Sequence, residues 1–252
     1  MEPLVGLAHT RAGMDEIRAA LADGDLAAAV PACPGWTLDD LVRHVGGIHR
    51  WVWGAVVEGH PDTELPAGPA GRAPLIDWYD EGAGRLLDVL VTADPDAPCW
   101  TFGPKPSSVR FWFRRQAHEH AVHAVDAAAS QARTLPLDPE LALDGVDEVV
   151  RMFFPRQVRL GRMPPLTRSL ALRPVGAGAG PDGEDGVRVL VGSGLAAEVA
   201  ALGPGSADAT VSGPAEALYL LAWRRIGLDD DRLTLIGDPA AARAVLAAAI
   251  IP

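Results

Sequence analysis

Apolar residues in the first part of the chain recur every three or four positions, which is the spacing of amphipathic helices. This spacing predicts four helices, at residues 8–22, 38–57 and 75–93 and around residues 114–127. A fifth helix is predicted at 139–153 and should lead from these four to the rest of the chain. At least two of the first four helices have one apolar face. Four helices of this length are typical of a helical bundle.

Turn and capping residues set the expected starts of two of these helices. In the stretch PACPGWTLDD, Thr37 is expected to be the N-cap, and Asp40, three positions on, gives a pattern close to a capping box. Ser107 or Ser108 is expected to cap the helix that contains residues 114–127. Both helices should therefore begin directly after a loop that is rich in proline.

The pattern changes after residue 160 to the short alternation that is typical of strands. Strands are predicted in LTRSLALRP, GVRVLVGS, ADATVSG and RLTLIGD, helices in PAEALYLLAWRRIG and PAAARAVLAAAI, and a flexible connection in VGAGAGPDGEDG. The sequence thus predicts an α+β fold with a helical bundle at residues 1–160 and a smaller α+β domain at 165–252. The boundary is expected near Pro164–Pro165.

Charge and composition narrow the classes of partner. The formal net charge is −11 and the pI is near 5, which disfavours nucleic acid and anionic membranes as partners. No apolar run reaches about 18 residues, so no membrane-spanning helix is expected. The first residues lack a basic segment followed by an apolar run, so no signal peptide is expected, and we predict a cytoplasmic protein.

Two further features of the composition bear on origin and chemistry. Lys105 is the only lysine among 22 basic residues, and alanine, glycine and proline are abundant, which suggests a GC-rich bacterial genome. Cys33 and Cys99 are too few for a disulfide framework or a four-cysteine zinc site. We expect both to be small buried residues, with a nucleophilic Cys33 as the alternative.

The stretch RRQAHEHAVHAVDA concentrates ionisable residues on one helix. Glu119 and His123 are one turn apart and share a face, which is either a solvated polar face or a pair of metal ligands. His44 lies on the apolar face of the helix at 38–57, where a structural, hydrogen-bonded histidine is the alternative to a ligand. If the two helices pack together, the three residues form a two-histidine, one-carboxylate site with an open position, as catalytic metal sites have.

Three segments carry a resemblance to a known family. The segments are CPGWTLDDLVRHVGGIHRW, FWFRRQAHEHAVHAVDA and DATVSGPAEALYLLAWRRIGLDDDRLTLIGD. They resemble, in order, the PGWT…DLxxH segment, the RRxxHExxxHxxDA helix and the C-terminal module of the DinB-like, mycothiol-dependent maleylpyruvate isomerase family. The similarity runs from the first expected helix to the last.

This resemblance implies a four-helix DinB bundle joined to a smaller α+β domain. It also implies a divalent metal, usually zinc, held by His44, Glu119 and His123. An arginine of the C-terminal domain lies near the site in the family, and its match here is Arg225, with Arg224 as the alternative. Asp126 matches the aspartate of the family motif; a hydrogen bond to an imidazole or an ion pair on the helix face would each explain it.

The resemblance further implies an enzyme that uses mycothiol as its cosubstrate. A metal-bound thiol would ionise at neutral pH and add to a small electrophile, with S-transfer favoured over isomerisation as the outcome. Two alternatives stay open: a hydrolase in which the same metal activates water, and a non-catalytic binding module that the metal stabilises. The residues leave the electrophile, the metal and the oligomeric state open.

Overall fold

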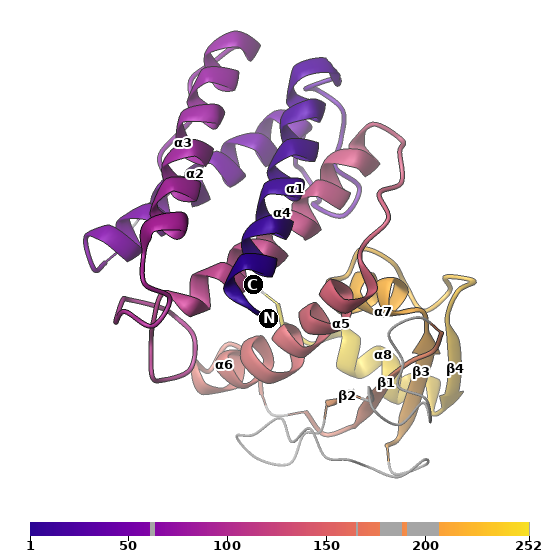
Figure 1. Ribbon diagram of the computed structural model, residues 1–252. Coiled ribbons are helices and arrows are strands. Elements are labelled where there is room, and N and C mark those ends of the chain that lie inside the picture. The colour runs from indigo at the N-terminus through magenta and orange to yellow at the C-terminus, as the bar shows by residue number, and fades with distance from the viewer. Residues whose placement is uncertain (61–63, 165, 177–187, 191–206, 252) are drawn as a thin grey trace. The chain divides into compact units, whose positions relative to one another are not determined.

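The computed structural model divides the chain into two compact units, Met1–Leu135 and Pro136–Pro252 (Figure 1). It describes residues 1–60, 64–164, 166–176, 188–190 and 207–251. Most of the predicted connection in VGAGAGPDGEDG lies outside the described residues. The predicted fold class, a helical first part followed by a smaller α+β part, is confirmed.

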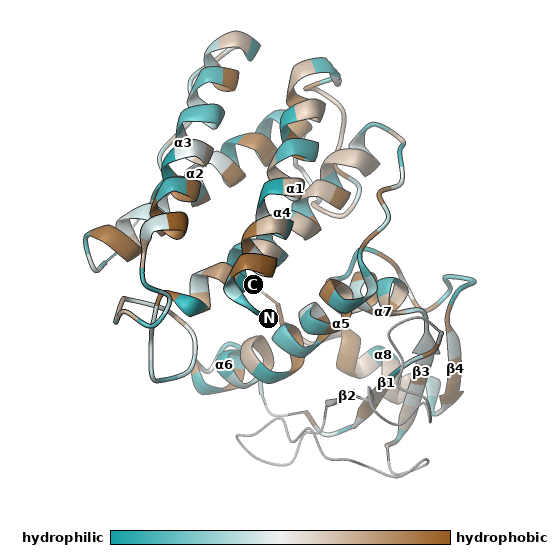
Figure 2. Ribbon diagram, viewed as in Figure 1, coloured by the Kyte–Doolittle hydropathy of each residue, from teal (hydrophilic) through white to brown (hydrophobic). Residues whose placement is uncertain are grey.

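The first unit contains four long helices. They are α1 (Pro3–Asp23), α2 (Leu38–Val57), α3 (Arg72–Thr92) and α4 (Arg110–Ser130). Helix α1 lies along α4, and α2 lies along α3 (Figure 1). Hydrophilic and hydrophobic residues alternate along these helices, as Figure 2 shows.

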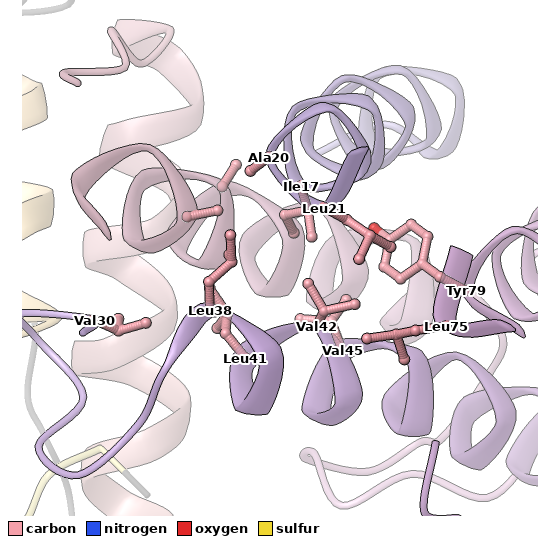
Figure 3. Packing of buried hydrophobic residues seen from close by; sticks show 12 residues of the cluster. Ile17, Ala20, Leu21, Val30, Leu38, Leu41, Val42, Val45, Leu75 and Tyr79 are labelled. Carbon is pink, nitrogen blue, oxygen red and sulfur yellow. The ribbon is translucent and has the colours of Figure 1, made fainter. Parts of the chain in front are cut away.

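All four helices contribute to one hydrophobic cluster. Figure 3 shows Ile17 and Leu21 of α1 facing Leu38, Leu41, Val42 and Val45 of α2, with Leu75 and Tyr79 of α3 at one end. Ala124 and Ala127 of α4 complete it. A second cluster, nearer the loop before α4, is rich in aromatic rings and includes Trp51, Trp100, Phe102, Phe111 and Trp112.

The capping box predicted for α2 is confirmed. The Thr37 hydroxyl accepts a hydrogen bond from the Asp40 amide, and the Asp40 carboxylate accepts one from the Thr37 amide. These bonds satisfy two backbone donors that no helical carbonyl can reach. The predicted serine cap of α4 is wrong: Val109 is the N-cap and makes no side-chain bond, while the Ser107 hydroxyl bonds Thr101 and Lys105.

Helices α1 and α4 approach closely because α1 presents glycines to α4. A Cβ atom added at Gly13 would lie 2.7 Å from the His120 Cβ and 2.8 Å from the His120 carbonyl oxygen. These are backbone-level contacts, which a rotamer change cannot relieve. The close packing therefore depends on the absence of a side chain at Gly13.

Substituting Gly13→Ala should therefore lower the free energy of unfolding by about 1–3 kcal/mol. The matched control is Gly84→Ala in α3, where an added Cβ meets nothing within 4 Å. That variant should gain about 0.5–1 kcal/mol, because alanine favours the helix over glycine. Urea denaturation of both variants checks this, and equal effects would contradict it.

The second unit combines helices with a four-stranded sheet. Its helical elements are α5 (Pro139–Glu148), the π-helix Val149–Phe153, α6 (Phe154–Arg159), α7 (Ala215–Ala222) and α8 (Pro239–Ala247). Its strands are β1 (Leu170–Pro174), β2 (Arg188–Leu190), β3 (Ala209–Gly213) and β4 (Thr234–Gly237), in the order β2-β1-β3-β4. Strands β1 and β3 are parallel, and the two outer pairs are antiparallel.

The division between the units lies earlier than the pattern of the sequence predicts. We expected the boundary near Pro164–Pro165, with the helix at 139–153 in the first domain; the structure divides the chain after Leu135. The reason is that α5 packs against α7, which belongs to the sheet-containing unit. Periodicity predicts that α5 has an apolar face but not which domain covers that face. Among the residues described, no helix has the length and hydrophobicity that a bilayer crossing requires.

Candidate metal centre

Three potential ligands converge between α2 and α4. One nitrogen each of His44 and His123 and one carboxylate oxygen of Glu119 lie within 4.8 Å of one another. The Glu119 Oε1 atom is 3.4 Å from the Nε2 atom of His44 and 3.4 Å from the Nε2 atom of His123. The structure thus brings together the three residues that the sequence analysis singled out.

These distances suit a shared cation better than direct hydrogen bonds. Nitrogen and oxygen ligands bind zinc at about 2.0–2.2 Å, so two ligands of a tetrahedral ion are about 3.4 Å apart. An N–H···O hydrogen bond usually spans about 2.7–3.2 Å. Two imidazoles and one carboxylate are also a donor set that divalent metals of the zinc type accept. The residues present therefore fit such an ion.

Helix geometry explains how the three side chains meet. Glu119 and His123 are four residues apart on α4, so their side chains lie one above the other on one face. His44 stands on α2 between the buried residues Leu41 and Val45 along the chain, and it keeps 27% of its side chain exposed. The packing of α2 on α4 thus brings His44 beside Glu119.

The Glu119 carboxylate is fixed by a buried arginine. The Arg115 side chain, one turn earlier on α4 and 4% exposed, donates a hydrogen bond of 2.8 Å to the Oε2 atom of Glu119. Only the Oε1 atom therefore faces the two imidazoles. Burial alone would raise the pKa of Glu119, but the imidazoles of His123 and His44 beside its carboxylate, together with the charge of Arg115, hold the pKa well below its usual value. Glu119 is thus a carboxylate at neutral pH.

The His123 imidazole is oriented by a carboxylate on its other side. Its Nδ1 atom lies 2.9 Å from the Oδ2 atom of Asp126. Burial lowers the pKa of His123, but the hydrogen bond to Asp126 and the nearby Glu119 carboxylate outweigh this effect and raise the pKa to about 9. Because Asp126 takes the Nδ1 hydrogen, the Nε2 atom is the one directed toward Glu119 and His44. Of the two roles weighed for Asp126, the structure shows the hydrogen bond to an imidazole.

The interpretation of this face as a solvated polar surface is wrong. Helix α4 is buried on most of its circumference, including Arg115, Gln116, His123 and Asp126. Buried ionisable groups of this kind must be paired or bound to a metal to avoid a large desolvation cost. The polar face of α4 is therefore part of an internal site.

Comparison with known proteins shows the family of this chain. The family model described as the mycothiol maleylpyruvate isomerase N-terminal domain matches residues 7–128, and that of the MDMPI C-terminal domain matches residues 140–244. The chain belongs to the mycothiol maleylpyruvate isomerase family. His44, Glu119 and His123 all lie in the part that the first model of this family matches.

The chain is also similar to two curated proteins and to two solved structures. The uncharacterized proteins MT0763 and Rv0738, from two strains of Mycobacterium tuberculosis, are each 31% identical over 154 residues, which are 57% of this chain and 75% of theirs. A crystal structure of the mycothiol-dependent maleylpyruvate isomerase is 16% identical, with a TM-score of 0.58 and 93% of each chain covered. A histidine-to-alanine variant of that isomerase gives a TM-score of 0.61 at 14% identity, again over 93% of each chain. The two structures show that the fold is shared.

The two candidate arginines belong to the second unit, in the part that the second isomerase-family model matches. Arg224 follows α7 in the left-handed conformation, with φ of 61°, and its guanidinium donates to the Ala248 carbonyl. Arg225 donates to the Trp223 carbonyl. These contacts lie within the second unit, and a role near the metal centre stays a prediction for both arginines.

Sequence reasoning missed two neighbours of the centre. It did not assign Arg115 to Glu119, although an arginine four residues before a glutamate on a helix is a usual ion-pair spacing. It treated Cys33 as a small buried residue, whereas the thiol is partly exposed and lies 3.8 Å from the Oδ2 atom of Asp126. No signal in the sequence indicates that second contact, because it joins a loop to a distant helix.

Proposed function

We propose that this chain is a metal-dependent enzyme that uses mycothiol to modify a small electrophile, by S-transfer or by an addition that leads to isomerisation. The metal, for which zinc is the best fit, would be held by His44, Glu119 and His123. The observation that carries the proposal is the convergence of these three ligands, in which the Glu119 Oε1 atom lies 3.4 Å from each imidazole Nε2 atom, the length of a tetrahedral edge. Three protein ligands are the usual number in catalytic zinc sites, where the fourth position takes water or substrate.

The residues around the ligands prepare them for this role. Arg115 keeps the Oε2 atom of Glu119 occupied, so the carboxylate offers one oxygen. Asp126 holds His123 with its Nε2 atom toward the centre. Buried outer partners of this kind orient metal ligands and raise their affinity.

The nucleophile would come from the cosubstrate, because neither cysteine of the chain suits that role. Burial raises the pKa of the Cys99 thiol, which lies against Trp112. The Cys33 thiol is directed to the Asp126 carboxylate. A bound zinc-type ion supplies the missing activation, since it stabilises the thiolate form of a thiol in its open position.

Arg225, or Arg224 in its place, would bind an anionic group of the thiol or of the electrophile. Arginine suits this role because its planar fork forms paired hydrogen bonds with a carboxylate. Family membership supports the use of mycothiol. S-transfer is the outcome we favour, because fold and family alone do not define the electrophile.

A thiol-transfer assay tests the proposal. Purified protein loaded with zinc should accelerate the reaction of mycothiol with monobromobimane, and a chelator should remove the effect. A free thiol of pKa ~8.5 is only about 3% ionised at pH 7, so full ionisation alone would give roughly thirtyfold acceleration over the uncatalysed reaction.

Other outcomes of this assay would overturn the proposal. Metal-dependent ester hydrolysis that is indifferent to mycothiol would indicate a hydrolase. Metal retention with no turnover of any thiol or ester would indicate a non-catalytic binding module. The control is the His44→Ala variant, which should behave as the chelated protein does.

A further inference from the structure

One loop of the first unit contacts His44 directly and reaches His123 through Asp126. This loop, residues 30–37, is called the PGW loop below. The ring of Trp36 packs at 5.0 Å between centroids against the imidazole of His44. Cys33 of the same loop lies against Asp126, which in turn bonds His123. A single short segment thus reaches the two imidazoles from two different helices.

We infer that Cys33 is a positioning residue, which holds Asp126 in the orientation that fixes the His123 imidazole for metal binding. This inference rests on the proposed function, because it assigns His123 the role of a ligand. It assigns Cys33 no covalent chemistry. The thiol acts as a hydrogen-bond donor.

The direction of the hydrogen bonds follows from the groups involved. An ionised carboxylate only accepts hydrogen bonds, so both the Cys33 S–H and the His123 Nδ1–H donate to Asp126. Both donors reach the same oxygen, Oδ2, at 3.8 Å from sulfur and 2.9 Å from nitrogen. An acceptor shared in this way is restrained from two sides, and the imidazole that it orients is restrained with it.

Burial makes this restraint matter. Asp126 is 1% exposed, so its carboxylate is shielded from water while the Cys33 side chain is in place. A buried acceptor deprived of a partner costs free energy or turns toward another group. Removing the Cys33 thiol should therefore disturb the Asp126–His123 bond, although Cys33 itself touches neither His123 nor the centre in the contacts described.

The backbone of the PGW loop holds Cys33 in place. The Cys33 amide donates to the Val30 carbonyl at 3.1 Å, and the Cys33 carbonyl accepts from the Trp36 amide at 3.0 Å. The Val30 amide also bonds the Trp36 carbonyl at 2.9 Å. Because these bonds fix the loop locally, the thiol can act as a fixed support and not merely follow the movement of Asp126.

The test compares four variants of the full chain by cobalt(II) affinity and by the NMR signal of the His123 Nδ1 proton. The variants are Cys33→Ala, Cys33→Ser, Asp126→Ala and, as the matched control, Cys99→Ala. A hydrogen bond to Asp126 protects that proton from exchange with water, so its signal reports the positioning contact with or without metal. Circular dichroism and thermal unfolding verify that each variant is folded.

Asp126→Ala should lower cobalt affinity by about 10- to 100-fold and abolish the protected Nδ1 signal. Cys33→Ala should lower affinity by about three- to tenfold and weaken the signal, because it removes one hydrogen bond from the support. Cys33→Ser keeps a donor and should restore both readouts. Cys99→Ala should leave both at their wild-type values, since Cys99 lies against Trp112 and not against a carboxylate.

Two results would overturn the inference. A Cys33→Ala variant with wild-type affinity and an unchanged Nδ1 signal would show that the thiol does not support Asp126. Loss of affinity in Cys33→Ser as large as in Cys33→Ala would show that packing of the sulfur atom, and not hydrogen bonding, is the contribution. Failure of the proposed function is distinct: the wild type would bind no cobalt, and the Nδ1 signal would still decide whether Cys33 acts on Asp126.

Discussion

Replacing His44 by alanine should remove nearly all tightly bound zinc and, with it, thiol-dependent turnover. His44 is one of three ligands and comes from a different helix than the other two, so its loss leaves only the Glu119–His123 pair on α4. Structural zinc sites with four protein ligands gain about 10–16 kcal/mol from metal binding, so one ligand accounts for roughly 2.5–4 kcal/mol. The expected loss of affinity is thus roughly 10²- to 10³-fold.

Metal analysis after dialysis, followed by titration with a chromophoric competitor, measures this loss. The matched control is His60→Ala, because His60 is exposed at the end of α2 and lies outside the centre. The His44→Ala variant is preferable to Glu119→Gln for this purpose. Removing the Glu119 charge would also leave Arg115 buried without that ion pair, which destabilises the fold by a separate route. Full metal content in His44→Ala would show that the centre is assigned wrongly.

The sequence predicts the parts of this centre that local geometry determines. The capping box fixes the start of α2, so the position of His44 along that helix follows from Thr37 and Asp40. The spacing of Glu119 and His123 places both on one face wherever α4 lies. What local geometry cannot supply is the packing of α2 on α4, and the choice of His44 as the third ligand needed the family resemblance as well.

The remaining contacts depend on tertiary packing that no local pattern carries. His49 shows this well. A helix wheel of α2 places it away from His44, beside Trp53. In the structure His49 is fully buried, because Tyr79 of α3 and His120 of α4 cover that side of α2. A helix that packs against two neighbours has two buried faces, and the hydrophobic pattern indicates only the more apolar one.

The domain boundary and the Cys33 contact were missed for the same reason. The pattern of α5 predicts an amphipathic helix, but its partner α7 lies far along the chain. Likewise Cys33 and Asp126 are 93 residues apart. Both contacts depend on how helices and loops pack against one another. Patterns in a single sequence predict the helices and loops but not this packing.

Protonation of the buried pair His49–His120 should have a large effect on the stability of the fold, and not on catalysis. Their Nε2 atoms are 2.9 Å apart and their rings are stacked at 5.1 Å. The His120 Nδ1 atom lies 2.8 Å from the Gln116 carbonyl and must carry a hydrogen there, so its Nε2 atom accepts from His49. This arrangement requires both rings to be neutral, since a second hydrogen on His120 would point at the N–H of His49.

The pKa values of both residues follow from this environment. Burial is the main cause that lowers the pKa of His120 to about 4, whereas the hydrogen bond to the Gln116 carbonyl acts in the opposite direction. Burial, followed by the proximity of His120, holds the pKa of His49 well below its usual value. In the unfolded chain both should titrate near 6.5. The unfolded state therefore binds more protons than the folded state between pH 6.5 and pH 4.

The stability that this pair contributes should accordingly be complete above pH 6.5 and fall as the pH is lowered toward 4. Each histidine contributes a slope of up to about 1.4 kcal/mol per pH unit, so the pair can cost a few kcal/mol by pH 5. His123 acts in the opposite direction, because its pKa is raised to about 9 in the folded state, whereas it should titrate near 6.5 in the unfolded chain. The contribution of the pair is therefore measured as a difference in slope between the wild type and a variant that lacks one of the two histidines.

Urea denaturation with a chelator present, at several pH values between 5 and 7.5, measures the slope without a contribution from metal binding. The variant His49→Phe removes one titrating group and keeps an aromatic ring beside Tyr79. The slope of its unfolding free energy against pH should be smaller than that of the wild type by up to about 1.4 kcal/mol per pH unit. This expectation holds even if the variant is less stable at pH 7.5. The control is the exposed His60→Phe, whose slope should equal that of the wild type. Equal slopes for the wild type and His49→Phe would mean that His49 takes up a proton in the folded protein as readily as in the unfolded chain. The description of His49 and His120 as a neutral stacked pair would then be wrong.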